Sequence, residues 1–333
     1  MMMDKRLINT VSESKKYIVG NVACQWVSLA ANITMMTAVT RMLMQLYNGE
    51  DAGIAPIAAV IVAAVIVRFV CARLSSKMSY LSSKAVKKTL REKIYEKLLR
   101  IGLSYKESVQ TSEIVQVAVE GVDQLETYFG AYLPQFFYAM LAPLTLFVVL
   151  VRVNLLSAVV LLICVPLIPV SIALVQTWAK KLLSKYWGQY TALGDTFLEN
   201  LQGLTTLKVY SADAYKHERM NEESEKFRKI TMKVLTMQLN SITIMDFIAY
   251  GGAALGMILA ISQFNAGKVD LSGCLLIVLL AADFFLPMRQ LGSFFHIAMN
   301  GMAASDKIFK LLELPEPGNV LTLIHISEPT RLQ

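Results

Sequence analysis

The chain has 333 residues, of which 55% are hydrophobic and 17% are charged, and its formal net charge is +7. This is more apolar side-chain surface than the core of a soluble protein of this length usually buries, so the composition indicates a polytopic membrane protein. The excess of basic residues is spread over segments that flank apolar stretches. That distribution argues against a nucleic-acid-binding protein, in which basic residues gather on one soluble face.

Residues 1–15 are expected to form an interfacial helix that leads into the first membrane span. Leu7, Ile8 and Val11 fall on one side of a helix with Lys5 and Arg6 beside them, which is typical of an amphipathic helix at a membrane surface. A solvated tail is the alternative. No short apolar core followed by a small-residue cleavage site is found here, so no removable signal peptide is expected.

Six stretches of the chain are apolar enough to cross a membrane as helices, which takes about 20 residues each. The predicted fold is therefore an all-α membrane protein with six transmembrane helices. The predicted spans are residues 17–46, 54–72, 128–151, 155–178, 237–264 and 271–296.

The segments that connect these spans differ greatly in length and charge. Residues 47–53, 152–154 and 265–270 are short, whereas residues 73–127 and 179–236 are long and contain most of the basic side chains. Because basic residues are enriched on the cytoplasmic side of membrane proteins, both long segments and both termini are predicted to be cytoplasmic.

The two long segments are predicted to be helical hairpins, because apolar residues recur in them at helical spacing. These residues are Leu90, Ile94, Leu98 and Ile101 in the first segment and Leu198, Leu201, Leu204 and Leu207 in the second. About 25 residues out and 25 back would carry each hairpin roughly 35 Å beyond the membrane.

Two long hairpins after the second and fourth spans, with short loops on the other side, are the layout of the transmembrane domains of type I ABC exporters, and residues 4–317 resemble that family. Residues 199–213, with Gly203 in a turn, look like its second intracellular loop. The resemblance implies a transmembrane domain at 16–312. It also implies coupling helices near 117–124 and 211–218, where a partner's nucleotide-binding domain would be contacted. The candidate coupling residues are Val117, Glu120, Asp123, Ala212, Asp213, Tyr215 and Lys216.

The first loop departs from the common exporter pattern at Ser112, where a glycine is frequent. Within the family, residues 284–309 and 314–317 are most similar to CydD/CydC-type transporters, and they favour the CydD side. That resemblance implies a heterodimer with a CydC-like subunit in the bacterial cytoplasmic membrane. It implies ATP-driven transport in support of cytochrome bd assembly, with a thiol such as cysteine or glutathione, or alternatively haem, as the substrate.

No Gly-x-x-x-x-Gly-Lys-Ser/Thr phosphate loop occurs in the chain, so this polypeptide alone is not expected to bind or hydrolyse ATP. No cofactor is expected in the chain itself. ATP and magnesium are expected in a nucleotide-binding domain after a linker at 313–322. Residues 323–331 look like the translation of a sequencing adapter, so 323–333 is interpreted as an artificial tail on a longer native protein.

Four ionisable residues fall within predicted spans: Asp246, Asp283, Arg289 and His296. Such groups are costly in a membrane and usually face a bundle interior or a wet cavity, which makes them candidates for lining the transport pathway. An interhelical hydrogen bond is the alternative for Asp246, Asp283 and Arg289. Asp283 and Arg289 are too far apart to pair on one helix, so each is expected to face another helix or water. His296 is a candidate haem ligand or a packed core residue.

No catalytic set and no metal cluster is predicted, and the four cysteines read as small buried apolar residues. Pro143, Pro166, Pro169 and Pro287 are expected to kink or open their helices, and Gly251, Gly252 and Gly256 to allow close helix approach or bending.

Two other functions are compatible with the sequence. One is a type I exporter for a peptide, lipid or drug. The other is a membrane carrier that is not driven by ATP, although such carriers rarely have two long cytoplasmic hairpins.

Overall fold

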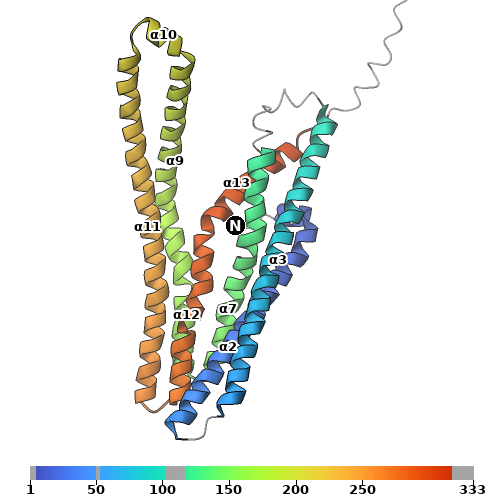
Figure 1. Ribbon diagram of the computed structural model, residues 1–333, viewed down its shortest axis with the longest axis vertical. Coiled ribbons are helices and arrows are strands. Elements are labelled where there is room, and N and C mark those ends of the chain that lie inside the picture. Colours follow the sequence, from blue (N-terminus) through green and yellow to red (C-terminus); the bar gives the residue numbers. More distant parts are fainter. Residues whose placement is uncertain (1–4, 50–52, 103–113, 115–116, 317–333) are drawn as a thin grey trace, which may run out of the picture. The chain divides into compact units, whose positions relative to one another are not determined.

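The structure is a computed structural model that describes residues 5–49, 53–102, 114 and 117–316 (Figure 1). Ser112 and the predicted artificial tail at 323–333 lie outside these residues. In chain order the helices are α1 (Lys5–Thr10), α2 (Ser12–Tyr47), α3 (Ile54–Ile101), η2 (Val117–Gly121), α6 (Val122–Thr127), η3 (Tyr128–Tyr132), α7 (Leu133–Val151), α8 (Leu155–Cys164), α9 (Leu167–Gln202), α10 (Leu204–Val209), α11 (Asp213–Asn265), α12 (Leu271–Ser293) and α13 (Phe295–Leu312).

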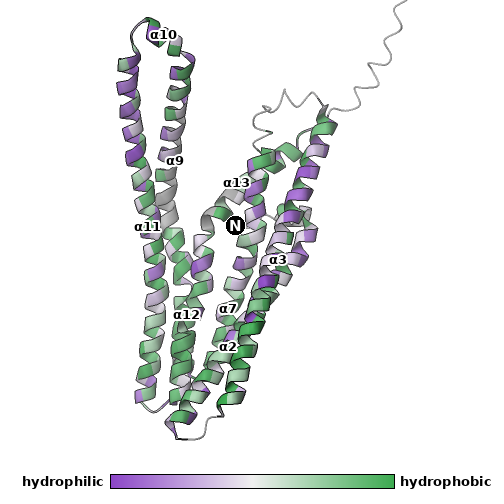
Figure 2. Ribbon diagram, viewed as in Figure 1, coloured by the Kyte–Doolittle hydropathy of each residue, from purple (hydrophilic) through white to green (hydrophobic). Residues whose placement is uncertain are grey.

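Within the part of the chain that the structure describes, six helical stretches are long and apolar enough to cross a membrane, which confirms the predicted fold of six transmembrane helices. They are Ser12–Tyr47, Ile54–Ile101, Val117–Val151, Leu155–Leu174, Asp213–Asn265 and Leu271–Ser293. In α3 and α11 the apolar residues gather at one end and the polar residues at the other (Figure 2). These two helices therefore continue beyond the membrane, as predicted for the arms of hairpins.

The helices pack into two units, each described by itself. The first holds α1, α2, α3, η2, α6, η3, α13, most of α7 and the beginning of α12. The second holds α8 to α11, the end of α7 and most of α12.

In the first unit, the antiparallel helices α2 and α3 are joined by a ladder of polar contacts. The hydroxyl groups of Ser14 and Ser82 lie 2.6 Å apart, and Ser75 donates a hydrogen bond of 2.7 Å to Asn21. Arg68 donates one of 2.9 Å to Asn32. The three α3 residues are seven positions apart, so they share one face of the helix. Each interhelical hydrogen bond of this kind contributes about 0.6 kcal/mol in a membrane.

In the second unit, α9 and α11 run side by side and α10 lies at their tip (Figure 1). The rings of Tyr186 and Tyr190 on α9 both contact the ring of Phe227 on α11, with centroids 5.4 Å and 5.9 Å apart. Aromatic contacts of this kind hold the two arms together well beyond the predicted spans 155–178 and 237–264.

Of the four prolines expected to disturb their helices, one coincides with a break. Pro166 lies in the gap between α8 and α9, whereas Pro143 and Pro287 lie within α7 and α12. Pro169 is in the first turn of α9, where the missing N–H of proline is tolerated. The last predicted span, 271–296, is also interrupted, since α12 ends at Ser293 and α13 begins at Phe295.

Two of the three glycines expected at close helix contacts are found there. A Cβ atom on Gly252 would lie 2.6 Å from Cζ of Phe285, and one on Gly256 would lie 2.8 Å from Cγ of Leu161. Gly251 differs, because its added Cβ atom would meet nothing within 4 Å. Gly252 and Gly256 therefore let α11 approach α12 and α8 closely.

The neighbouring glycines provide a matched test of this packing. Alanine at either position raises helix propensity equally, so the difference between the two variants isolates the contact with Phe285. We expect Gly252→Ala to be less stable than Gly251→Ala by about 1–3 kcal/mol, the usual cost of overpacking. Thermal unfolding of the two variants in detergent measures this difference. Equal stability would show that α11 and α12 are not closely packed at this level.

Candidate functional site

The second hairpin ends in a turn that backbone hydrogen bonds hold in place. α9 ends at Gly203, whose N–H donates a 2.9 Å hydrogen bond to the carbonyl of Glu199, and α10 begins at the next residue. A Cβ atom on Gly203 would lie 3.2 Å from that carbonyl oxygen, which explains why a residue without a side chain suits the position. The sequence predicted a turn at Gly203, and the structure confirms that turn.

The other end of α10 closes with a regular C-terminal motif. Ser211 has a positive φ of 51°, the N–H of Ala212 bonds to the carbonyl of Leu207 at 2.9 Å, and the N–H of Ser211 bonds to that of Lys208 at 3.2 Å. This pair of bonds is a Schellman motif, with serine at the left-handed position where glycine is more usual. The chain therefore turns sharply into α11.

Ion pairs reinforce this end of the hairpin. Lys208 pairs with Asp213 across the turn and lowers the pKa of the Asp213 carboxyl below its ordinary value, mainly through their hydrogen bond. Lys216 on α11 pairs with Glu199 on α9 at 3.3 Å. Contacts between exposed charges contribute little stability, so they orient the turn more than they stabilise it.

The same turn exposes large apolar side chains. Val209 is 73% exposed, Tyr210 78% and Tyr215 62%. The charged residues Lys208 and Asp213 flank these side chains. An apolar cluster at the charged end of a hairpin indicates a surface that binds another protein.

The structure places the predicted coupling residues Ala212, Asp213, Tyr215 and Lys216 at this end of the hairpin. Ala212 precedes α11, and the other three lie in its first turn. The short helix at the tip is α10, Leu204–Val209, and the predicted coupling segment 211–218 follows it. Val209 and Tyr210 were missed, although apolar residues in a polar stretch were a signal for them.

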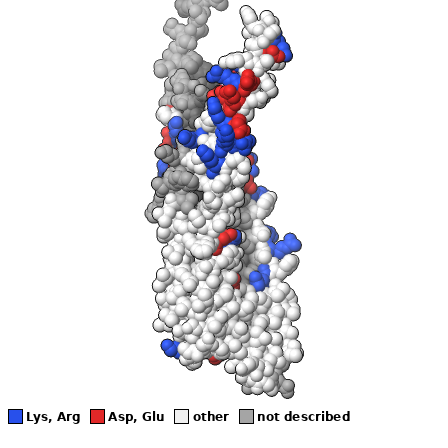
Figure 3. Space-filling model, turned by 90° about the vertical axis from the view of Figure 1, so that its left-hand side faces the viewer, with Lys and Arg blue, Asp and Glu red and all other residues white. Residues whose placement is uncertain are grey.

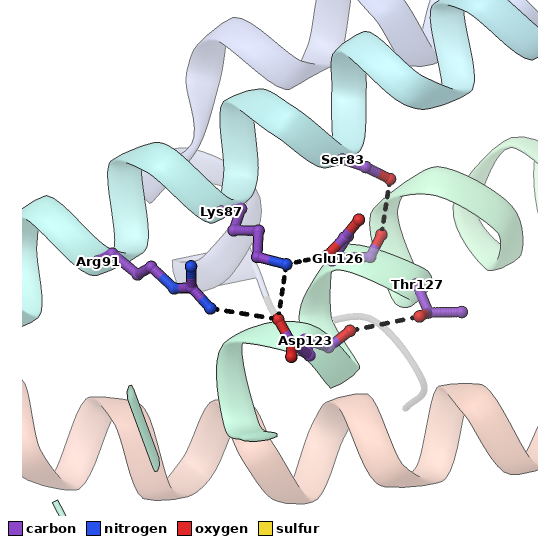
Figure 4. A network of polar contacts seen from close by, with 6 residues as sticks. All are labelled: Ser83, Lys87, Arg91, Asp123, Glu126 and Thr127. Carbon is purple, nitrogen blue, oxygen red and sulfur yellow. Dashed lines mark hydrogen bonds and ion pairs between the residues drawn. The ribbon is translucent and has the colours of Figure 1, made fainter. Parts of the chain in front are cut away.

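The first hairpin contains a cluster of charged residues that joins its two arms (Figure 4). Lys87 on α3 pairs with Asp123 and Glu126 on α6, at 2.8 Å in both cases, and Arg91 pairs with Asp123 at 3.4 Å. The two carboxylates raise the pKa of Lys87 above its ordinary value, Asp123 more than Glu126. Lys87 is therefore positively charged at neutral pH and faces two negative partners.

Serines of α3 hold the adjoining backbone. The hydroxyl groups of Ser79 and Ser83 donate to the carbonyls of Gly130 and Glu126 at 2.6 Å and 3.1 Å. These carbonyls belong to the region where α6 passes into the π-helical turn η3, and such turns leave carbonyl groups open to other donors. The serines thus fix α3 to a part of the third span that departs from regular α-helix.

Helix α13 packs against the same region. A Cβ atom on Gly301 would lie 3.0 Å from Tyr128, and one on Gly121 would lie 3.8 Å from Ile308. Val122, Leu125 and Tyr128 are fully buried beneath the charged cluster. We refer to Lys87, Arg91, Asp123 and Glu126, with this buried layer, as the joint of the first hairpin.

The structure places the predicted coupling segment 117–124 in η2 and the first turn of α6. Asp123 lies opposite Lys87, and α3 continues for 14 residues to Ile101, or about 21 Å. Val117 is buried and Glu120 is exposed in η2 on the returning arm. Residues 103–113, 115 and 116 lie outside the described residues. The segment 117–124 is therefore part of the arm.

Two of the predicted pathway residues form an interhelical ion pair in the second unit. Arg289 on α12 binds Asp246 on α11 through two nitrogens, Nε to Oδ1 and Nη2 to Oδ2, the latter at 3.1 Å. The guanidinium also lies 5.9 Å from the ring centroid of Tyr250. The side chains of Arg289 and Asp246 are 36% and 32% exposed, so the pair is only partly enclosed. The expectation that Arg289 faces another helix is confirmed.

The other two predicted pathway residues, Asp283 and His296, do not belong to this ion pair. Asp283 lies six residues earlier on α12, and His296 lies at the start of α13, where its side chain is outside the described atoms. All four cysteines are free thiols. Among the described residues, no group of three or more His, Cys, Asp or Glu side chains is placed to hold a metal ion.

The arrangement suits the transmission of force between two distant ends of a helix pair. Each hairpin is tied across its arms, and the second ends in a fixed turn with exposed apolar side chains. Movement of such an end shifts whole helices, because packed elements move as rigid bodies.

Comparison with known proteins identifies the family. Residues 16–288 match the family described as the ABC transporter transmembrane region. An uncharacterised ABC transporter ATP-binding protein of Haemophilus influenzae is 51% identical over 87% of this chain and 52% of its own length. The glutathione/L-cysteine transport protein CydD of Escherichia coli is 27% identical over 73% of this chain and 42% of its own. CydC of Bacillus subtilis, also a glutathione/L-cysteine transport protein, is 24% identical over 87% and 51%.

The chain thus spans about half the length of the curated relatives that it matches. The match covers all six apolar helices except the first residues of α2 and the last residues of α12. The chain belongs to the family of ABC transporter transmembrane regions and has the six-helix fold of a type I ABC exporter.

Proposed function

We propose that this chain is the permease part of an ATP-driven, CydD-like exporter that moves a thiol such as cysteine or glutathione across the bacterial cytoplasmic membrane. The observation that carries the proposal is the second hairpin. It ends in a fixed turn with exposed apolar side chains, as a lever driven by another domain requires. The likeness to the two glutathione/L-cysteine transport proteins supports the substrate class.

The distribution of charge supports the orientation. In the second unit, charged side chains occupy the end that contains α10, and the opposite part is largely uncharged (Figure 3). Basic residues favour the cytoplasmic side, so both hairpins and both termini are cytoplasmic in this proposal. The nucleotide-binding domains that supply ATP and magnesium would then meet the tips of the hairpins.

A partner subunit of the CydC type completes the proposal. In the first hairpin, the periodic residues Leu90 and Ile94 are buried within the chain. In the second, the corresponding residues Leu198, Leu201 and Leu204 are each more than half exposed. An apolar stripe of this kind gains stability when another subunit covers it, and the homologous CydD and CydC proteins suggest which subunit. Haem is the alternative substrate.

The test is transport by the full-length protein with its partner in proteoliposomes. We expect ATP-dependent movement of radiolabelled glutathione or cysteine by the wild-type protein. In the variant Tyr210→Glu/Tyr215→Glu, we expect ATP hydrolysis to continue while transport per ATP falls about tenfold or more. Two buried carboxylates at a docking surface cost several kcal/mol, enough for a shift of that size.

The matched control is Asn221→Glu on α11, an exposed polar position two turns from the start of that helix. It adds a carboxylate without touching the apolar cluster, so its transport per ATP should equal that of the wild type. An unchanged ratio in the tyrosine variant would remove the coupling role from this turn. Transport of lipid or peptide in place of a thiol would overturn the substrate class and leave the coupling role standing.

A second experiment tests whether the ion pair between Asp246 and Arg289 stabilises the fold or contacts the transported substrate. If the pair is structural, Asp246→Asn leaves Arg289 without its partner and destabilises the chain by about 2 kcal/mol. That is less than the 3–5 kcal/mol for a fully buried pair, because both side chains are about one third exposed.

The double variant Asp246→Asn/Arg289→Gln should then regain most of this loss in thermal unfolding. We expect that result, together with unchanged substrate preference in transport. Equal stability of all three proteins, with altered preference in the single variant, would instead assign the pair to the pathway.

A further inference from the structure

A basic groove lies between α9 and α11 in the second unit, apart from the tip and from the ion pair of Asp246 and Arg289. It has a volume of about 560 Å³ and is lined by four lysines, Lys185 on α9 and Lys226, Lys229 and Lys233 on α11. Leu182 and Ile230 form an apolar part of its wall. The groove thus combines positive charge at the rim with an apolar surface.

Helical spacing explains why these residues meet. Leu182, Lys185 and Gln189 are three and four positions apart on α9, and Lys226, Lys229 and Lys233 follow the same spacing on α11. Residues at this spacing share one face of a helix, so the two helices present two parallel stripes. Gly188 keeps the α9 side open, because a Cβ atom there would meet nothing within 4 Å.

The positive charge of the groove is poorly balanced by the protein. Lys229 lies 3.7 Å from Glu225, which also binds Arg228 through two closer contacts. Lys185, Lys226 and Lys233 have no ion pair with an acidic side chain among the residues that the structure describes. Three neighbouring cations without counter-charges favour an anionic ligand.

The distance between the groove and the apolar spans indicates which kind of anion the groove binds. Lys233 is four residues before the predicted span 237–264, and Lys185 is seven residues after the span 155–178, so they lie about 6 Å and 11 Å from apolar sequence. Lysine side chains reach several ångströms toward a membrane surface. Tryptophan, which is enriched at membrane interfaces, occurs at Trp178, the last residue of the predicted span 155–178.

The distribution of charged side chains on the surface around the groove agrees with a position close to the membrane surface. Basic side chains form a band between the acidic side chains and the uncharged part of the surface (Figure 3). In α11 the acidic residues Glu218 and Glu222 precede the groove lysines, which are closer to the apolar end. Lipid phosphates would therefore meet lysines before they meet carboxylates.

We propose that this groove binds the headgroup of an anionic phospholipid, with Lys185, Lys226 and Lys233 around the phosphate and an acyl chain starting along Leu182 and Ile230. Basic pockets between membrane helices bind anionic headgroups in this way. A lipid bound here bridges α9 and α11 where they leave the membrane. This site is independent of the transported substrate.

The test is tryptophan quenching in nanodiscs of phosphatidylcholine that contain increasing fractions of brominated phosphatidylglycerol or brominated phosphatidylcholine. Trp178 and Trp187 lie in α9 on either side of Lys185, and Trp26→Phe removes the third tryptophan from every protein compared. We expect half-maximal quenching at about tenfold less phosphatidylglycerol than phosphatidylcholine, because the lysines attract the anionic headgroup.

The variant Lys185→Gln/Lys226→Gln/Lys233→Gln should lose this preference, and the corresponding arginine variant should keep it. The control Lys77→Gln/Lys84→Gln/Lys93→Gln removes three exposed lysines from α3, so both glutamine variants change the net charge from +7 to +4 (7 − 3 = 4). The control should keep the preference. Equal loss in both glutamine variants, or no loss in either, would overturn the proposal. Loss of the preference when inorganic phosphate is added would also overturn it, because the site would then bind a soluble anion.

Discussion

The long helices of this chain have to stay rigid where no membrane supports them. α11 has 53 residues, or about 80 Å, whereas the hydrocarbon core of a bilayer is about 30 Å thick. Isolated helices gain little stability from propensity alone, so the protruding parts depend on contacts between their own arms. In the first hairpin these contacts are the joint around Lys87, and in the second they are the aromatic residues Tyr186, Tyr190 and Phe227.

The joint works through two layers with different tasks. Its ion pairs are partly exposed, since Lys87 and Glu126 are 34% and 36% exposed, and such pairs contribute about 0–1 kcal/mol each. The layer beneath them is fully buried, with Val122, Leu125 and Tyr128 at 0% exposure, and burial of this kind contributes about 1.5–3 kcal/mol per large side chain. The apolar layer therefore supplies stability and the charges fix the register of the two arms.

The sequence was sufficient for the fold and for part of the site. Hydropathy located six spans, and charge with apolar periodicity predicted both hairpins. The separate short helix α10 was not predicted, because residues 208–218 mix polar and apolar side chains without a periodic signal. In addition, Ser211 occupies a position where glycine would have marked the helix end. The joint was missed because it pairs residues more than 30 positions apart. The seven-residue spacing of Arg68, Ser75 and Ser82 was a readable signal for the polar ladder.

The joint should make the first hairpin a rigid lever, as the fixed turn at α10 does for the second, and a charge exchange between Lys87 and Glu126 tests this most directly. In the full-length protein with its partner, the measurement is transport per ATP hydrolysed for Lys87→Glu, for Glu126→Lys and for the double exchange. Each single variant brings like charges together and should lower the ratio several-fold. The double variant restores an opposite-charge pair between positions 87 and 126 and should recover part of the loss, because the new carboxylate at position 87 still faces Asp123. Unchanged ratios in the single variants, or a double variant no better than either, would contradict the account.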